Sequence, residues 1–372
     1  MMKRLLQKLR EDIRGFGFKQ WFLIILNAAL VLAAAASLAG LRMVAGTLES
    51  LTAAERFQGD GELRYAQIAC YLPVGDGKTE DDIYTFHQSL ESRLVEQSLK
   101  AAENGRLYLD AYCGTGKVTI TGETGSASVE AVGVGGDFFY FHPLQLRSGS
   151  YIRSGDIMDD LVVLDEETAW RIFGGTDLTG MTVTINDKAF VVGGVVHRED
   201  DFASKRAYSG EGGIFLSFTA LTRLLEDTRI SCYEIVMPDP ISGFAKGLVS
   251  EVFPVGNGDV VQNSGRYSPA SLLTVLKNFP GRSMRLNGVI YPYWENAARL
   301  TEDYAALLLL AAAVFLLIPL LFLITAVIRY VRWTYRFAKA KIPEKVEEAV
   351  EKHREERLEK KLENKAGGDG DG

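Results

Sequence analysis

Cysteine is scarce in this 372-residue chain, which contains only Cys70, Cys113 and Cys232. Three cysteines are too few for a disulfide scaffold, and an odd number leaves at least one unpaired. We expect all three to be small buried residues on strands. A bridge from Cys70 to one of the other two is the alternative.

Motifs for catalysis and for cofactor or metal binding are also missing. The GTGK sequence at 114–117 lacks the glycine spacing of a phosphate-binding loop, and GVGG at 133–136 lacks that of a dinucleotide site. No nucleophile elbow occurs. The acid clusters at 80–82 and 199–201 lack calcium-ligand spacing. The four histidines form no metal-ligand motif with nearby Cys, Asp or Glu. The sequence therefore predicts neither an enzyme nor a cofactor or metal site.

Positive charge is scarce in the long middle of the chain. Residues 42–303 carry 23 Lys and Arg against 36 Asp and Glu, a net charge of −13. Such a domain repels nucleic acid, which we exclude as a partner. Basic residues gather instead at the two ends, with six in 1–20 and five in 329–341.

Two long runs without charge are present, at 21–41 and at 305–328. At ~1.5 Å rise per residue each is long enough to cross a hydrocarbon core of ~30 Å as a helix. We predict transmembrane helices at 21–41 and 304–328. No small-residue cleavage motif follows the first run, so it is typical of an uncleaved anchor.

The basic ends set the orientation, because Lys and Arg favour the cytoplasmic side. Both termini are predicted to be cytoplasmic, with residues 42–303 outside the cytoplasmic membrane. Residues 1–20 are predicted to form an amphipathic helix on the lipid surface. Residues 329–372 are predicted to form a basic segment followed by a charged helical tail.

Both runs carry features of helix packing. Small residues recur at helical spacing at Ala29, Ala33 and Ser37, and Asn27 is a polar group that needs a partner in hydrocarbon. Pro319 removes one hydrogen bond from the second run and predicts a kink. Two interpretations remain open: the two helices pack on each other, or they offer a face to membrane helices of another chain.

The middle region predicts an α+β domain, because strand and helix patterns alternate. A strand at 63–72 precedes a helix that Thr79 caps, and further strands follow. We expect helices on one face of the sheet. Residues 43–58 and 292–303 are expected to extend the two transmembrane helices into a paired helical stalk.

The block at 151–229 has a different character, with short strands and a hairpin whose tip is Asn186-Asp187. A strand and a helix after residue 230 complete the first pattern. We therefore predict a porter-like β-α-β part, at about 59–150 and 230–265, and an inserted, smaller, mainly-β part at about 151–229.

Several short patterns belong together. GDFF at 136–139 is followed by Leu144, Leu146, Gly149 and Tyr151, LVVLDE begins at Leu161, DLTG occupies 177–180, and FVVGGV occupies 190–195. In this order, and between two transmembrane segments, they resemble the MacB-like periplasmic core domain of FtsX-like ABC transporter permeases. The resemblance is strongest over 129–196.

The resemblance implies a permease in which a partner ATPase moves the membrane helices and a stalk conveys that motion to the outer domain. The implied partners are an ABC ATPase, a permease or further copies of this chain, and an extracytoplasmic adaptor. The family has four transmembrane helices and this chain has two, so the others are expected from another subunit. The candidates for ATPase or lipid contact are Arg329, Arg332, Arg336 and Lys339. The alternative is an extracytoplasmic sensor or scaffold without ATP coupling.

Overall fold

The structure is a computed structural model that describes residues 17–73, 75–99, 105–156, 158–208, 212–279 and 289–366. It separates into two compact units, Ala39–Leu309 and the combination of Met1–Leu38 with Leu310–Gly372. The first unit holds the sheet and the second holds the apolar helices, and each is described by itself.

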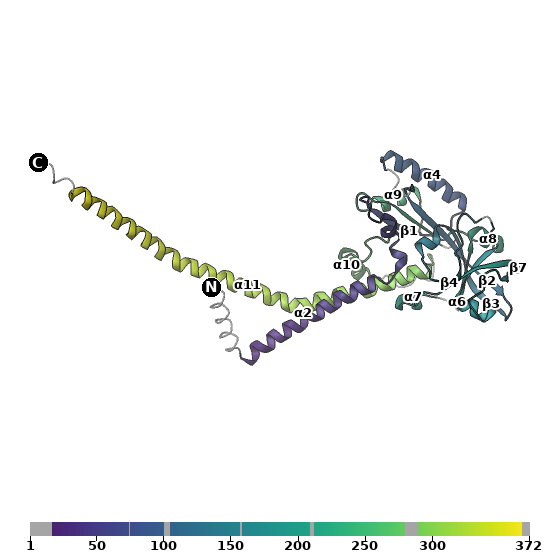
Figure 1. Cartoon of the computed structure of the whole chain (residues 1–372), viewed down its shortest axis with the longest axis horizontal. Coiled ribbons are helices and arrows are strands. Elements are labelled where there is room, and N and C mark those ends of the chain that lie inside the picture. Colours follow the sequence, from purple (N-terminus) through teal and green to yellow (C-terminus); the bar gives the residue numbers. More distant parts are fainter. Residues whose placement is uncertain are drawn as a thin grey trace. The chain divides into compact units, whose positions relative to one another are not determined.

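Within the described residues, ten strands form one sheet (Figure 1). Nine follow the order β10-β1-β9-β2-β3-β8-β5-β7-β4, and β6 pairs with both β2 and β7. The pairs β3–β8 and β5–β7 are parallel and the others are antiparallel. The strands are β1 (Tyr65–Tyr71), β2 (Leu109–Thr121), β3 (Ser126–Gly136), β4 (Leu146–Gly149), β5 (Leu161–Asp165), β6 (Thr182–Ile185), β7 (Lys188–Val196), β8 (Gly213–Ser217), β9 (Cys232–Pro238) and β10 (Asp259–Gln262).

Most of the helices belong to the same unit as the sheet, and two of them, α2 and α11, extend into the second unit. They are α2 (Phe18–Ala45), the 3-10 turn η1 (Glu49–Leu51), α3 (Ala53–Gln58), α4 (Glu80–Glu96), α5 (Phe138–Phe141), α6 (Glu166–Phe173), α7 (Phe202–Ala207), α8 (Phe218–Leu224), α9 (Phe244–Val252), α10 (Pro269–Asn278) and α11 (Tyr293–Ala366).

The prediction of helices on one face of the sheet is wrong, because both faces of β1 are covered. Ile68 and Cys70 pack under α4 and α9 in one hydrophobic core. Ala69 and Tyr71, on the opposite face, pack with α3 and the first turn of α11 in another. Alternation along β1 therefore sends small and aromatic residues into two cores rather than into one core and solvent.

Local signals placed several elements correctly. The side chain of Thr79 accepts a hydrogen bond from the Asp82 N–H, and the Asp82 carboxylate accepts one from the Thr79 N–H, which starts α4. Asn186 and Asp187 have φ of 44° and 63°, as a two-residue hairpin turn between β6 and β7 requires. The three cysteines are buried on β1, β2 and β9, and none of them is in a disulfide.

Other expectations differ from the structure. The first helix continues over residues 43–45 but not over 46–58, because α2 ends at Ala45, where the Gly46 N–H bonds to Arg42 O and the Thr47 hydroxyl bonds to Val44 O. Residues 109–121 form one long strand, β2. Strands β4, β5, β7 and β8, all from the block at 151–229 or just before it, lie beyond β3 in the same sheet, while β6 pairs with β2 and β7.

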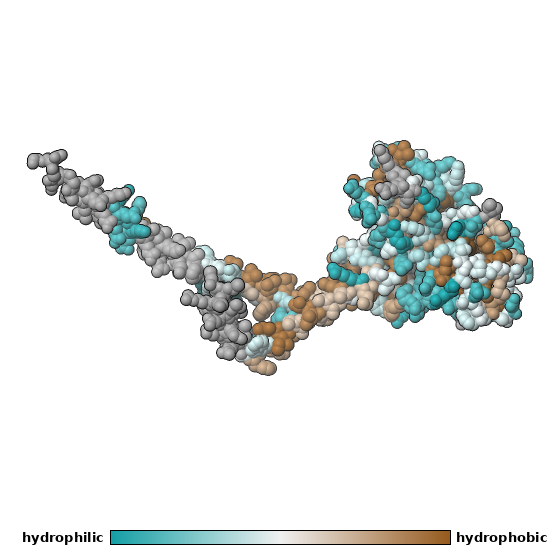
Figure 2. Space-filling view, in the orientation of Figure 1, coloured by the Kyte–Doolittle hydropathy of each residue, from teal (hydrophilic) through white to brown (hydrophobic). Residues whose placement is uncertain are grey.

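The second unit contains most of α2 and of α11. Among the described residues, these two helices are long and apolar enough to cross a membrane, and Figure 2 shows hydrophobic residues along both. Each has a stripe of less exposed residues at a spacing of three and four, which is the pattern of helices packed along their length. The stripes contain Asn27, Leu30, Ala34 and Ser37 on α2, and Ala312, Phe315 and Pro319 on α11.

The two predictions for the chain ends lie partly outside the described residues. Of the amphipathic helix at 1–20, residues 1–16 lie outside them, and residues 18–20 are the first turn of α2. The charged tail at 343–365 is helical, as the last part of α11.

Candidate functional site

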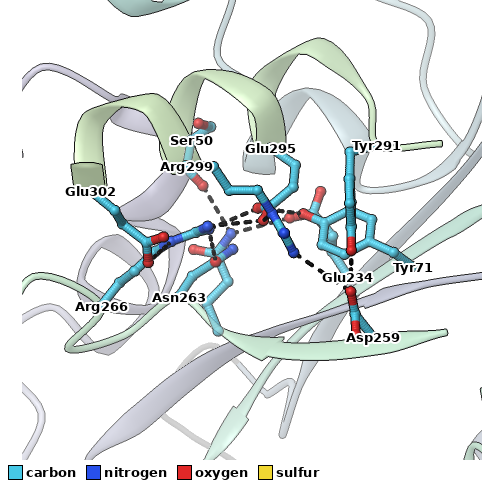
Figure 3. Close-up of polar contacts among 11 residues, drawn as sticks. Ser50, Tyr71, Glu234, Asp259, Asn263, Arg266, Tyr291, Glu295, Arg299 and Glu302 are labelled. Carbon is cyan, nitrogen blue, oxygen red and sulfur yellow. Dashed lines mark hydrogen bonds and ion pairs between the residues drawn. The ribbon is translucent and has the colours of Figure 1, made fainter. Parts of the chain in front are cut away.

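A buried group of charged side chains fixes the first turns of α11 to the sheet (Figure 3). At its centre is Arg266, in the turn that follows β10. Its Nη1 and Nη2 donate to the two carboxylate oxygens of Glu295, at 2.7 and 2.8 Å, and its Nε donates to Glu302 Oε1 at 2.6 Å. All three nitrogens of one guanidinium are thus used, two of them in a bidentate pair with defined geometry.

A second arginine on α11 extends this group toward β10. Arg299 Nε donates to Glu295 Oε1 at 2.6 Å, and its Nη2 lies 3.6 Å from Asp259 Oδ2. The Tyr71 hydroxyl on β1 donates to Glu295 Oε2 at 3.1 Å. Glu295 therefore accepts hydrogen bonds from β1, from the turn after β10 and from its own helix. We call these residues the Arg266 cluster: Tyr71, Asp259, Arg266, Glu295, Arg299 and Glu302.

The electrostatics of the cluster favour its ionised form. Burial by itself raises the pKa of Glu295, but the neighbouring Arg266 and Arg299 outweigh burial and hold that pKa below its ordinary value. Burial acts to lower the pKa of Arg266, and the carboxylates of Glu295 and Glu302 reverse this and raise it. Each charge is therefore stabilised by its partners, and loss of one leaves the others unpaired in a buried place.

Helix periodicity explains why three of these side chains meet. Glu295, Arg299 and Glu302 are spaced by four and three residues, so they lie on one face of α11. Arg266 is held by its own turn, since its N–H bonds to Asn263 O and its Nη1 donates to Asn263 Oδ1 at 3.0 Å. The acid at Glu295 also suits the first turn of a helix.

A second set of buried hydrogen bonds holds the segment that follows α2 to the sheet. Gln67 on β1 donates to Ser50 O at 2.8 Å and accepts from the Ala53 N–H at 3.2 Å. Its Nε2 also lies 3.4 Å from Glu234 Oε1, and the other oxygen of Glu234 lies 2.5 Å from His142 Nε2. The chain is therefore hydrogen-bonded to the sheet both where it arrives from α2 and where it leaves into α11 (Figure 3).

The side chains predicted for helix packing are not brought together into a site. Asn27 Nδ2 donates to Leu23 O of its own helix at 2.8 Å, while its Oδ1 is buried without a hydrogen-bond partner among the described residues. Ser37 bonds to Ala33 O at 2.9 Å, again within α2. Ala29 is exposed, and α11 continues without a break through Pro319.

The predicted coupling residues lie on α11, far along the chain from the Arg266 cluster. Arg329, Arg332 and Arg336 are exposed, and Lys339 belongs to the helix but its side chain lies outside the described residues. The Arg266 cluster itself was missed. The available signal was the spacing of Glu295, Arg299 and Glu302, three charges on one helix face beside aromatic residues.

Among the described residues, no group of three or more His, Cys, Asp or Glu side chains is arranged to hold a metal ion. The fold and the cluster define a class of protein. It is an α+β domain that is hydrogen-bonded to its entering and leaving segments, and these segments continue into apolar helices. The chain belongs to the MacB-like periplasmic core domain family, whose model matches residues 24–242, more than half of its length. This confirms the resemblance and the α+β fold class predicted from the sequence.

Three solved structures resemble part of this chain at low identity. The periplasmic region of MacB from Actinobacillus actinomycetemcomitans is 16% identical, with a TM-score of 0.38, covering 63% of this chain and all of that one. The extracellular domain of the noncanonic ABC-type transporter YknZ from Gram-positive bacteria is 14% identical, with a TM-score of 0.36, covering 51% and 90%. A domain of a putative permease protein from Porphyromonas gingivalis is 13% identical, with a TM-score of 0.30, covering 53% and 88%. Among curated proteins, none matches the chain.

Proposed function

We propose that this protein is a non-catalytic, permease-like subunit of an ABC-type membrane complex. It couples a partner ATPase to the outer domain, for export or for transmitting mechanical work across the envelope. Membership of the MacB-like family and the two apolar helices support this proposal. The additional membrane helices of such a complex come from a permease partner or from further copies of this chain, and an extracytoplasmic adaptor is the partner on the outer side.

The Arg266 cluster is the observation that carries the proposal. It binds the first three turns of α11 to β1 and to the turn after β10, and the same helix continues through the apolar run into the basic segment at 329–341. Removing one partner of a buried ion pair costs about 3–5 kcal/mol, because the other charge is left unpaired. Sliding or rotation of α11 against the sheet would likewise unpair buried charges and is therefore resisted. A displacement of the membrane helix would therefore move the sheet rather than slip past it.

The topology is part of this proposal. Both termini are cytoplasmic, residues 42–303 are outside, and the porter-like and inserted parts divide the outer domain as predicted above. Two faces then remain for partners: the α2 surface that includes Ala29, and the exposed Arg329, Arg332 and Arg336, which meet an ATPase or anionic lipid.

Partner capture tests the coupling. The full chain with an affinity tag is cross-linked in native membranes, purified and analysed by mass spectrometry. We expect an ABC ATPase to co-purify, and we expect the triple variant R329Q/R332Q/R336Q to lose it by about tenfold or more, as for a contact of at least ~1.4 kcal/mol. Lys339 and Lys341 remain in this variant to preserve orientation.

The matched control is R354Q/R357Q, which removes exposed arginines further along the same helix and should retain the ATPase. Repeated absence of any ABC ATPase from the wild-type sample would overturn ATP coupling and favour the sensor or scaffold interpretation. Topology is checked with Val95→Cys, an exposed position on α4. Labelling of intact cells by an impermeant maleimide is expected, and labelling only after the cytosol is opened would contradict the orientation.

A further inference from the structure

Helix α10 packs beside α11 at the place where the apolar run of α11 begins. Leu272 and Val275 form a small core with Ala305 and Ala306, and the half-buried Leu41 and Leu309 are among the residues that pack against it. Leu41 ends the first apolar run and Ala305 starts the second. These contacts fix the level of α10 along the stalk: it lies beside the outer ends of both predicted transmembrane segments.

The apolar face of α10 is wider than the surface that α11 covers. Leu272 and Val275 are buried, whereas Leu273 is 53% exposed and Phe279, directly after the helix, is 44% exposed. With 100° per residue, these residues and Leu276 fall on one side of the helix. The opposite side carries the polar residues Ser271, Thr274, Lys277 and Asn278.

Further apolar side chains are exposed at the same level. Leu307 on α11 and Met43 near the end of α2 are both exposed. Tyr304 is also exposed, and its ring packs edge to face against Phe202 of α7 with 5.0 Å between ring centroids. Exposed apolar side chains on α2 and α11 therefore lie within two residues of Leu41 and Ala305, beside which α10 packs.

We propose that α10 is an interfacial helix that inserts Leu273 and Phe279 into the boundary between headgroups and acyl chains of the outer leaflet. Lipid is the occupant that the structure favours, because the contacts with Ala305 and Ala306 place α10 where the apolar run enters the bilayer. The polar side, with Lys277, faces headgroups and water. This inference rests on the membrane topology proposed above, and it adds a second lipid contact through which membrane thickness or composition acts on the outer domain.

Spin labelling tests the inference in the full chain, reconstituted in liposomes of phosphatidylethanolamine and phosphatidylglycerol. The three native cysteines are buried and can remain, provided that the parent protein takes up no label. Single labels are placed at L273C and F279C. The controls are T274C on the polar side of α10, V95C on α4, and L317C within the apolar run of α11. Collision with oxygen reports hydrocarbon, and collision with a nickel chelate reports water.

At positions 273 and 279 we expect the accessibility ratio to favour oxygen, as at 317, and at 274 and 95 we expect it to favour the nickel chelate. Oxygen preference at 317 combined with nickel preference at 273 and 279 would overturn the interfacial helix and leave the membrane topology intact. Protection of 273 and 279 from both reagents would also overturn it, since protein rather than lipid would then cover them. Nickel preference at 317 would refute the transmembrane assignment itself.

Discussion

Two groups of ion pairs in this protein use the same residue types in opposite surroundings. In the Arg266 cluster the side chains of Arg266 and Glu295 are 4% and 1% exposed. In a second group, at the far end of the sheet, Arg147 Nε lies 3.1 Å from Glu166 Oε2, and these side chains are 38% and 31% exposed. His197 Nδ1 also contacts this Glu166 oxygen, at 2.7 Å.

The difference shows that burial, rather than the number of charges, decides what an ion pair contributes. The Glu166 group is screened by water, and its members lose little when separated. The charges of the Arg266 cluster are shielded from water, so each is stabilised by its partners in the cluster rather than by solvent. Of the two groups, only the buried one links the sheet to α11, the helix that continues out of the domain. This is why we assign the proposed coupling to it.

The largest effect is expected from Arg266→Met, which removes the central charge and keeps similar volume. Glu295 and Glu302 lose their shared partner in a buried place, and the outer domain should lose about 3–5 kcal/mol of unfolding free energy. Urea titration of the full chain in non-ionic detergent measures this, because maleimide labelling of the buried Cys70, Cys113 and Cys232 reports unfolding of the sheet.

A combined variant, R266M/E295L/E302L, is the control for that experiment. Replacing buried ion partners together with apolar residues of similar size is often neutral. This variant removes the three most buried charges and leaves Arg299 beside Asp259, so it should recover part of the loss. If the single and the combined variants were equally unstable, packing rather than unpaired charge would be the cause, and the contrast between the two groups would fail.

An intermediate effect is expected from acid. The pKa of Glu295 is held below its ordinary value of 4.5, so its ionised form contributes stability that is fully present above pH 4.5 and is lost as the pH falls through the lowered pKa. The loss is at most about 1.4 kcal/mol per pH unit for this one proton. Urea titrations followed by near-UV circular dichroism between pH 3 and 7 measure it. The slope below pH 4.5 should be smaller in Arg266→Met, and an unchanged slope would assign the acid loss to other carboxylates.

The smallest effect is expected from Arg147→Gln in the exposed group. Here we expect a loss below about 1 kcal/mol, which 0.5 M salt should reduce further. The same cysteine-labelling titration checks this value. A loss as large as that of Arg266→Met would show that the two groups are equivalent and would remove the reason for assigning the coupling to one of them.

Signals that act within a few residues were sufficient to predict much of the fold. The Thr79 cap, the Asn186-Asp187 turn and the alternation in β1 each depend on neighbouring residues, and each element lies where it was predicted. The family resemblance depended on such local patterns too. The apolar runs needed only their length and lack of charge.

The Arg266 cluster could not be predicted in the same way. Its partners are 29 and 36 residues apart along the chain, and only the packing of α11 on the sheet brings them together. Strand β10 has four residues, none of them fully buried, so it produces no strong pattern. The first helix fails to extend over 46–58 for a local reason, since Gly46, a weak helix former, follows the last helical residue, Ala45.

Strand β2 has a consequence for the order in which the domain folds. Its 13 residues pair with β3 over 11 register positions, and the two strands adjoin in sequence. Strands β9 and β6 pair with the two ends of β2 along its other edge. Short-range contacts of this kind cost the least loop-closure entropy. We therefore expect the β2–β3 hairpin to form first and to serve as the template to which β8 and β9 add from opposite sides. Its backbone amides should then exchange with deuterium last, and a nascent chain that ends before β8 should already protect them in part.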